Sequence, residues 1–170
     1  GVKLTLLQRI TANNEPPINV CLAQGILKGE KMDYVVQKAV EIGVNMIIPM
    51  LTSHCVVQYD NAKKSVRIER WQKIAREAAK QCGRNIIPTV LPVQSLHEVV
   101  ENTGHNTTTA IMLYEADAPE TLKEVLTSPH PSTNYVVIVG PEGGFSLAEM
   151  TLCREANFHI ATLGPRILRA

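Results

Sequence analysis

Apolar residues recur along two stretches of the chain at steps of three and four residues. These stretches are Met32–Ile42 and Lys64–Cys82. Such spacing places the apolar side chains on one face of an α-helix, so both stretches are predicted to be amphipathic helices. Gly43 and Gly83 follow them directly, and glycine suits the left-handed conformation in which many helices end.

Short apolar runs between these helices predict strands. The strongest is Tyr135–Gly140, a continuous β-branched run that we expect to be buried on both faces. The other predicted strands are Val20–Leu27, Met46–Met50, His54–Val57, Ile86–Val90, Thr109–Tyr114 and Phe158–Leu163. Further helices are predicted at Ser95–Glu101, Pro119–Leu126 and Ser146–Ala156, the last with a capping box of Ser146 and Glu149. This alternation predicts an α/β fold, a mostly parallel sheet with helices on both faces.

The start of the chain differs from the rest. Val2–Ile10 alternates enough to predict a strand, and Thr11–Pro17 is a polar connector that ends in two prolines. We interpret residues 1–17 as the end of a preceding domain plus a linker, and residues 18–170 as the main domain.

Composition narrows the class of protein. The chain is 45% apolar and 19% charged with a mean hydropathy of −0.01, which is typical of a globular protein. Its net charge is only +1, so a nucleic-acid contact must come from a local basic face. No apolar run approaches the roughly 18 residues of a membrane span. The four cysteines are scattered, as is typical of reduced thiols in a cytoplasmic protein and not of a zinc site.

Ligands of parallel sheets bind beyond the carboxyl ends of the strands, which directs attention to three loops. One follows Tyr114, one is Gly140–Phe145 and one is Leu163–Arg169. Glycines in the second loop let backbone amides approach a ligand, and the aliphatic residues and free backbone groups of the third suit an adenine-like ring. A plain tight turn and a solvated chain end explain the same two patterns.

A basic stripe follows the polar face of the longer predicted helix. Lys73, Arg76, Lys80 and Arg84 are separated by steps of three, four and four residues, so they share one side. The stripe is explained either by an RNA contact or by a solvated face whose charges pair locally, for example with Glu77.

Four segments of the chain occur in a recognisable order. They are KGEKMDYVVQKAVEIGV (Lys28–Val44), RWQKIAREAAKQCGR (Arg70–Arg84), GPEGGFS (Gly140–Ser146) and LGPRILR (Leu163–Arg169). Together they resemble the RsmE family, the SPOUT-class methyltransferases that modify a uridine N3 in bacterial 16S ribosomal RNA. The last two segments are highly specific as a pair, and the resemblance extends from about Val20 onward.

The resemblance implies a trefoil-knotted α/β domain that binds S-adenosylmethionine, forms a homodimer and uses no metal. The cofactor-binding residues that it implies are Leu113, Tyr114, Gly140, Pro141, Glu142, Gly143, Gly144, Leu163, Gly164, Pro165, Ile167 and Leu168. The residues expected at the RNA, with those of the stripe, are Lys31, Lys73, Arg76, Lys80, Gln81 and Arg84. The expected partner is 16S rRNA or the assembled small ribosomal subunit, in the cytoplasm and away from membranes.

Methyl transfer from a sulfonium to a uracil N3 needs an in-line approach and donors for the negative charge that develops on the ring oxygens. A guanidinium supplies a planar pair of such donors. We predict Arg169 or Arg166, with Arg84 from the helix, in this role. Glu142 is predicted to orient the base or relay its proton, and a purely structural role in holding its loop explains its position equally.

The chain departs from the family pattern at both ends. The family has an N-terminal PUA-like RNA-binding domain, and it continues past LGPRILR into a C-terminal helix. We therefore expect the 170 residues alone to be inactive on ribosomal RNA. Two alternatives stay open: a non-catalytic RNA- or ribosome-binding module with a degenerate nucleotide pocket, and another α/β enzyme that holds a phosphate in the glycine loop. Binding of S-adenosylhomocysteine, in competition with an adenine nucleotide, distinguishes the three.

Overall fold

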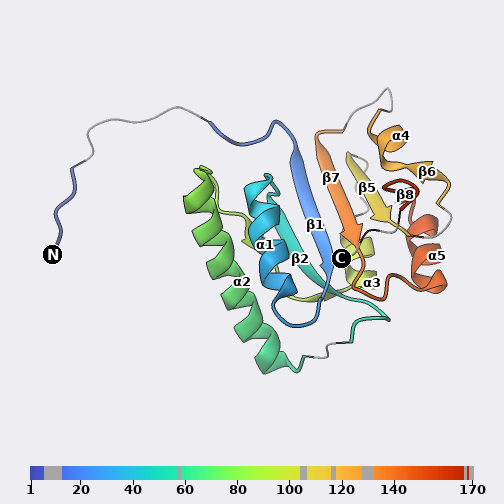
Figure 1. Cartoon of the computed structure of the whole chain (residues 1–170), viewed down its shortest axis with the longest axis horizontal. Helices are drawn as coiled ribbons and strands as arrows, with labels where there is room; N and C mark the ends of the chain where they lie inside the picture. The colour runs from blue at the N-terminus through green and yellow to red at the C-terminus, as the bar shows by residue number, and fades with distance from the viewer. Residues whose placement is uncertain are drawn as a thin grey trace.

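The computed structural model describes residues 1–5, 13–56, 59–103, 107–115, 118–127, 132–166 and 168 (Figure 1). Its elements, in chain order, are β1 (Asn19–Gly25), α1 (Lys31–Glu41), β2 (Met46–Leu51), α2 (Asn61–Cys82), β3 (Thr89–Val90), β4 (Gln94–Ser95), α3 (Leu96–Thr103), β5 (Thr108–Leu113), β6 (Glu120–Thr121), α4 (Leu122–Leu126), β7 (Asn134–Val139), α5 (Leu147–Glu155) and β8 (His159–Thr162). No helix in these ranges is long and apolar enough to cross a membrane.

The strands form one eight-stranded sheet, and every strand pair within the described residues is parallel. The order is β3-β2-β1-β7-β5-β8-β6, and β4 also pairs with β2. Strands β1 to β4, the first four in the chain, therefore form one half of the sheet, and β5 to β8 form the other. The halves meet where β1 pairs with β7, from Asn19 opposite Asn134 to Gln24 opposite Val139. A reversal of strand order at such a seam opens a crevice at the carboxyl ends of the strands.

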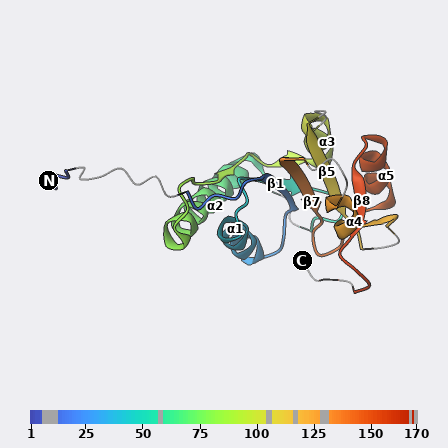
Figure 2. The same ribbon diagram turned by 90° about the horizontal axis from the view of Figure 1, so that it is seen from above.

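Helices cover both faces of the sheet, as Figure 2 shows. Side chains alternate along each strand, so neighbouring residues of β1 enter different cores. Leu22 packs with α1 and α2, whereas Ala23 packs with α3 and α5. A smaller cluster of Ile111, Val125 and Ala161 lies under α4. The predicted α/β fold is confirmed, and the threading of a knot stays a prediction.

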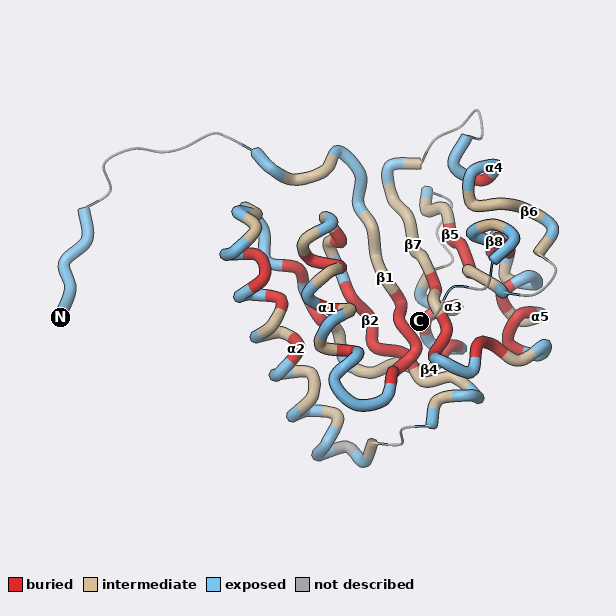
Figure 3. Tube along the Cα trace, in the orientation of Figure 1, coloured by how far each residue is buried: buried red, intermediate tan, exposed pale blue. Residues whose placement is uncertain are grey.

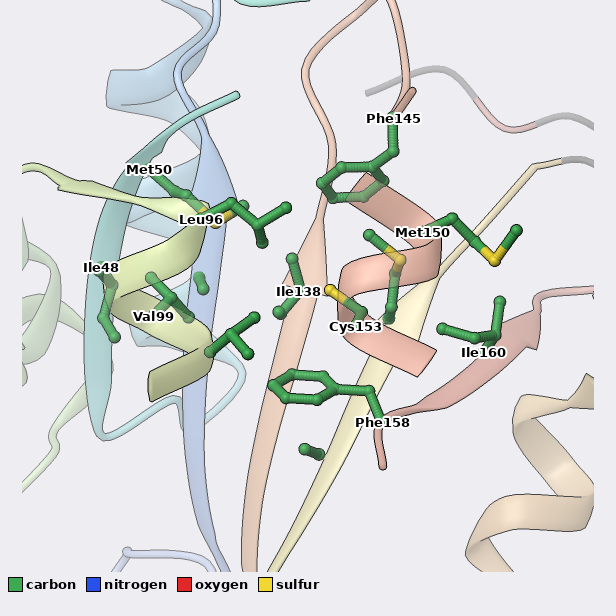
Figure 4. Packing of buried hydrophobic residues seen from close by; sticks show 14 residues of the cluster. Ile48, Met50, Leu96, Val99, Ile138, Phe145, Met150, Cys153, Phe158 and Ile160 are labelled. Carbon is green, nitrogen blue, oxygen red and sulfur yellow. The ribbon is translucent and has the colours of Figure 1, made fainter. Parts of the chain in front are cut away.

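The core beneath α3 and α5 joins the two halves of the sheet. Figure 4 shows Val99 of α3 and Cys153 of α5 on either side of Ile138 from β7, with Phe145 above them. Figure 3 shows buried positions at the lower ends of β1 and β7 and on the inward faces of the helices that cover the sheet. Because full burial of such a side chain is worth about 1.5–3 kcal/mol, this shared core fixes the seam between β1 and β7.

Capping residues explain where the two long helices begin and end. Helix α2 begins three residues before the predicted Lys64, because the Asp60 side chain accepts a hydrogen bond from Lys63 N at 2.8 Å. It ends at Gly83, whose φ of +74° is left-handed, and Gly43 after α1 has a φ of +103°. Both glycine stops are confirmed.

Several predicted strands differ from the structure. Residues 2–5 are exposed and lack strand structure, and residues 6–10 lie outside the described residues. Residues 54–56 likewise form no strand, and Val57 lies outside the residues that the structure describes. The predicted strand at Ile86–Val90 is reduced to β3, and the predicted helix at Pro119–Leu126 begins only at Leu122, because β6 first pairs with β8.

Strand β7 is central but less buried than predicted. Only Ile138 is fully buried, and its neighbours in the strand are half-buried. One face of β7 lies toward the short helix α4, whose five residues cover little area. At the other end of the strand, Val139 lines a cavity. The expectation of burial on both faces is therefore wrong for most of the strand.

A buried ion pair fixes the connector before β1 to the end of α2. Glu15 Oε2 accepts hydrogen bonds from Arg84 Nε at 3.0 Å and Nη2 at 2.5 Å, and the two side chains are only 7% and 4% exposed. Glu15 Oε1 accepts from the backbone amides of Asn85 and Ile86, while Arg84 Nη1 donates to Val44 O. The expectation that Arg84 contacts RNA is corrected, because its guanidinium is enclosed within the domain.

The ion pair predicts an acid-sensitive contribution to stability. The hydrogen bond from Arg84 holds the pKa of the Glu15 carboxyl below its usual value. A lowered folded-state pKa stabilises the protein above the unfolded-state pKa, and this contribution is lost as the pH falls through the folded-state value. We expect Glu15→Gln to lower the free energy of unfolding by about 1–3 kcal/mol at pH 7, because it leaves Arg84 buried without a counter-charge.

The measurement is urea unfolding at pH 7 and at a series of lower values. The difference between wild type and Glu15→Gln should shrink as the pH drops below about 4, near the ordinary carboxyl pKa. Glu101→Gln, an exposed carboxyl on α3, serves as the matched control and should be neutral. A constant difference at all pH values would contradict the linkage.

Candidate functional site

A cavity of about 590 Å³ opens beyond the carboxyl ends of β5, β7 and β8. It is lined by Leu113, Tyr114, Glu115, Val139, Gly140, Pro141, Glu142, Phe145, Thr162, Leu163, Arg166 and Leu168. The three loops singled out in the sequence converge on it, because their strands are neighbours in the sheet. Its volume is that of a site for one small organic ligand.

A second hollow lies elsewhere, at the start of α2. It has about 430 Å³ and is lined by Tyr59, Ala62, Lys63, Val66 and Arg67. These residues belong to the first turns of α2 and to Tyr59 just before it, and none of the three loops singled out in the sequence contributes to the hollow. The convergence of three loops therefore makes the 590 Å³ cavity the candidate site.

The glycine loop, Gly140–Gly144, is held against the end of β1. An added Cβ at Gly25 would lie 2.6 Å from Pro141 N and 2.9 Å from Gly140 C, so the two backbones touch where only glycine fits. The buried Gln24 amide donates to Gly140 O at 3.1 Å. The first residues of the loop are thus positioned by the seam between β1 and β7.

The Glu142 carboxylate turns toward the start of α1. Its Oε1 accepts a hydrogen bond from Lys28 N at 3.2 Å. The same oxygen forms an ion pair with Lys31 Nζ at 2.8 Å. Burial raises the pKa of the Glu142 carboxyl, but the hydrogen bond from Lys31 and those from backbone amides outweigh it, and the net pKa is lowered. Of the two roles left open for Glu142, these contacts support the structural one.

The loop between β2 and α2 forms hydrogen bonds with the glycine loop and with the helix that follows it. The Nδ1 atom of His54 lies 2.8 Å from Gly143 O, and because a carbonyl only accepts, Nδ1 carries the proton. Ser53 N donates to Glu149 Oε1 at 2.7 Å, while Glu149 Oε2 accepts from Ser146 N at 2.8 Å.

Glu149 therefore does more than cap its helix. Burial raises the pKa of the Glu149 carboxyl, but the hydrogen bonds from Ser146 and Ser53 lower it by more. The net pKa is therefore lowered, and the carboxyl stays ionised. The predicted capping box is confirmed. The additional contact to Ser53 could not be read from the local pattern.

The opposite wall of the cavity comes from the segment after β8. Thr162 Oγ1 donates to Gly164 O at 3.0 Å and accepts from Gly164 N at 3.2 Å, which turns the chain sharply at a glycine with a φ of +122°. This turn places Leu163 and Arg166 at the cavity. Arg169 and Ile167 lie outside the described residues.

The predicted cofactor-binding residues fall into two groups. Those that line the cavity are Leu113, Tyr114, Gly140, Pro141, Glu142, Leu163 and Leu168. Those that belong to the same loops without lining it are Gly143, Gly144, Gly164 and Pro165. The lining residues that sequence reasoning missed are Glu115, Val139, Phe145 and Thr162. Glu115 and Phe145 lie within loops that the sequence singled out, and Val139 and Thr162 directly precede the other predicted residues, so extending two loops by one residue toward their strands would have found the latter pair.

The residues predicted at the RNA are dispersed. Lys73, Arg76 and Gln81 are exposed on α2, as is Lys80, whose Nζ binds Glu77 at 2.9 Å. Helix α2 lies on the far side of α1 from β7 in both views (Figures 1 and 2). The basic stripe is therefore a surface apart from the cavity.

The cysteines offer no nucleophile to the cavity. The four thiols are free, and none of them lines the cavity. Burial raises the pKa of the Cys153 thiol to about 12 and that of Cys21 to about 11. Both are therefore protonated near neutral pH and are poor nucleophiles.

The close approach of β1 and the glycine loop predicts the effect of a single methyl group. Gly25→Ala should lower the free energy of unfolding by about 1–3 kcal/mol, because backbone atoms of the loop must move. Gly29→Ala is the matched control: its Cβ meets no atom of the described residues within 4 Å, and it costs only about 1 kcal/mol for its left-handed φ. Equal losses in urea unfolding would show that the contact at Gly25 is unimportant.

Comparison with known proteins identifies relatives over the whole chain. A family model described as an RNA methyltransferase domain matches residues 14–170. Two proteins named Ribosomal RNA small subunit methyltransferase E, from Bacillus subtilis (strain 168) and Buchnera aphidicola subsp. Acyrthosiphon pisum (strain APS), are 32% and 36% identical to it over 99% of its length. This chain covers 67% and 64% of them, so it spans about two thirds of their length.

Solved structures agree with these matches. A Ribosomal RNA small subunit methyltransferase E from Neisseria gonorrhoeae, bound to S-adenosyl methionine, has a TM-score of 0.86 at 37% identity, over 95% of this chain and 64% of that one. A putative methyltransferase from Legionella pneumophila, in complex with the bound cofactor SAM, has a TM-score of 0.84 at 35% identity, over 94% of this chain and 64% of that one. By sequence and by fold, this chain belongs to the RNA methyltransferase domain family that includes ribosomal RNA small subunit methyltransferase E.

Proposed function

We propose that this chain is the catalytic domain of an S-adenosylmethionine-dependent methyltransferase that modifies a uridine N3 in 16S ribosomal RNA. The observation that carries the proposal is the convergence of the two family-specific segments, GPEGGFS and LGPRILR, on one 590 Å³ cavity. The relative from Neisseria gonorrhoeae, whose structure contains S-adenosyl methionine, supports the choice of cofactor.

The cavity residues fit this cofactor. Leu113, Val139, Phe145, Leu163 and Leu168 supply apolar walls for an adenine ring. Backbone groups of the glycine loop lie beside them, held by β1 and by the loop after β2. The bound cofactor would supply an electrophilic methyl group, and these residues would bind and orient it.

The arginines are proposed to serve the nucleic-acid substrate. Arg166 lines the cavity, and within the described residues no hydrogen bond or ion pair engages its guanidinium. A guanidinium there can donate to a uracil oxygen as N3 loses its proton, which stabilises the developing negative charge. Arg169 is proposed for the same role. Glu142 is proposed to hold the glycine loop through Lys28 and Lys31, and its orientation of the base stays a prediction.

A second copy of the chain is the proposed protein partner. Leu163 and Leu168 are large apolar residues that line the cavity and are more than half exposed. Exposed apolar side chains gathered in one region are typical of an interface, which supports a homodimer with the cavity close to it. The proposed setting is the cytoplasm, with 16S rRNA or the assembled small subunit as substrate.

The first test of the proposed function is cofactor binding. Gly143→Val should abolish the binding of S-adenosylhomocysteine in calorimetry, because even a Cβ at this position lies 3.0 Å from His54 Cβ and a larger side chain must displace the glycine loop. Ala148→Val, exposed on α5, is the control and should bind normally. Thermal unfolding checks that both variants are folded.

Two results would contradict this assignment. Unchanged affinity in the folded Gly143→Val variant would place the ligand elsewhere. Failure of the wild-type chain to bind S-adenosylhomocysteine would favour the non-catalytic RNA-binding module, and preference for an adenine nucleotide would favour a phosphate-binding enzyme.

The basic stripe is proposed to contact RNA, with Arg84 now left out. Replacing Lys73 and Arg76 by glutamine should weaken binding to a 16S rRNA fragment and flatten the slope of log affinity against log salt by about one unit per lost phosphate contact. Lys123→Gln, which alters an exposed lysine on α4, is the control. An unaltered slope in the double variant would mean that the stripe is only a solvated face.

A further inference from the structure

One carboxylate at the cavity has no assigned role. Glu115 lies two residues beyond the end of β5 and lines the cavity. Its carboxylate lies directly over Gly144: a Cβ added there would collide with Oε1 and would lie 2.7 Å from Cδ. The missing side chain of Gly144, which also has a φ of +65°, thus leaves the space that the carboxylate occupies.

The charge of Glu115 is not balanced by neighbouring residues. Among the described residues no hydrogen bond or ion pair engages it, whereas the other carboxylate of the lining, Glu142, is paired with Lys31. Arg166 also lines the cavity, yet the two form no ion pair. When a ligand fills the cavity and excludes water, an unpaired carboxylate there becomes costly unless the ligand brings a cation.

We propose that Glu115 binds the α-ammonium group of the cofactor's methionine moiety. This inference rests on the proposed function, which makes S-adenosylmethionine the ligand. An ammonium carries three N–H donors and forms short, charge-assisted hydrogen bonds to a carboxylate. Glu115 is then a specificity-determining residue, which selects a ligand with a free amino group over an adenosine that lacks one.

The chemistry of methyl transfer favours the ammonium over the other cationic group of the ligand. The sulfonium loses its positive charge as the methyl group leaves. A carboxylate beside it would stabilise the reactant more than the transition state and would slow the reaction. The ammonium keeps its charge throughout, so a carboxylate bound to it anchors the ligand without opposing the transfer.

The test compares two ligands by calorimetry. S-adenosylhomocysteine contains the ammonium, whereas 5′-methylthioadenosine has the same adenine, ribose and thioether sulfur without the amino-acid portion. We expect Glu115→Gln to weaken S-adenosylhomocysteine binding about tenfold and to leave 5′-methylthioadenosine within twofold of wild type. S-adenosylmethionine should weaken by the same factor as S-adenosylhomocysteine. Glu101→Gln is the matched control for loss of a surface charge and should bind all three ligands normally.

Each other outcome overturns the inference. Equal weakening of both neutral-sulfur ligands would place the carboxylate on the ribose hydroxyls, and weakening of S-adenosylmethionine alone would place it on the sulfonium. No weakening would show that Glu115 does not touch the ligand. If the wild-type chain binds none of the three, the proposed function itself fails, which is distinct from failure at Glu115 alone.

Discussion

The contact between the end of β1 and the start of the glycine loop determines most of what surrounds the cavity. Gly25 lets Pro141 approach its backbone, and the buried amide of Gln24 binds Gly140 O. These contacts lie at the seam of the two sheet halves, so the packing of the whole domain fixes where the loop begins. The remaining contacts, from Lys31 to Glu142 and from His54 to Gly143, then fix its middle. A loop held on two sides in this way is preorganised for a ligand, and geometry is what methyl transfer requires most.

Periodicity and end signals in the sequence predict the elements well, because their causes are local. The 3–4 spacing of Lys64–Cys82 and the Ser146–Glu149 box depend only on residues within one turn or a few turns of each other. The rule that ligands sit at the carboxyl ends of parallel strands then locates the cavity without any knowledge of side-chain contacts. Burial is harder to predict, because the exposure of β7 depends on the size of α4, a helix that packs mainly against β6 and β8.

Single residues of the site were harder to predict than loops. Arg84 continues the spacing of the basic stripe, yet its partner Glu15 lies 69 residues away in a connector that carries no regular structure. Glu115 has no pattern around it at all; its significance comes from the space above Gly144, which exists only in the folded chain. Charge patterns along a helix therefore indicate which side chains share a face, and long-range packing decides which of them reach solvent.

Glu149 shows how one side chain can limit what the sequence tolerates. In an ordinary capping box glutamine replaces glutamate readily, because a single oxygen is enough to accept from the backbone of the capping residue. Here both oxygens accept, one from Ser146 N and the other from Ser53 N, 96 residues from Glu149. Glutamine has only one carbonyl oxygen and could accept from only one of these two amides. Its NH₂ group would face the other amide, which is also a donor, and that amide would be left without an acceptor. A position that looks interchangeable within its own helix is therefore restricted to a carboxylate by a loop on the other half of the sheet.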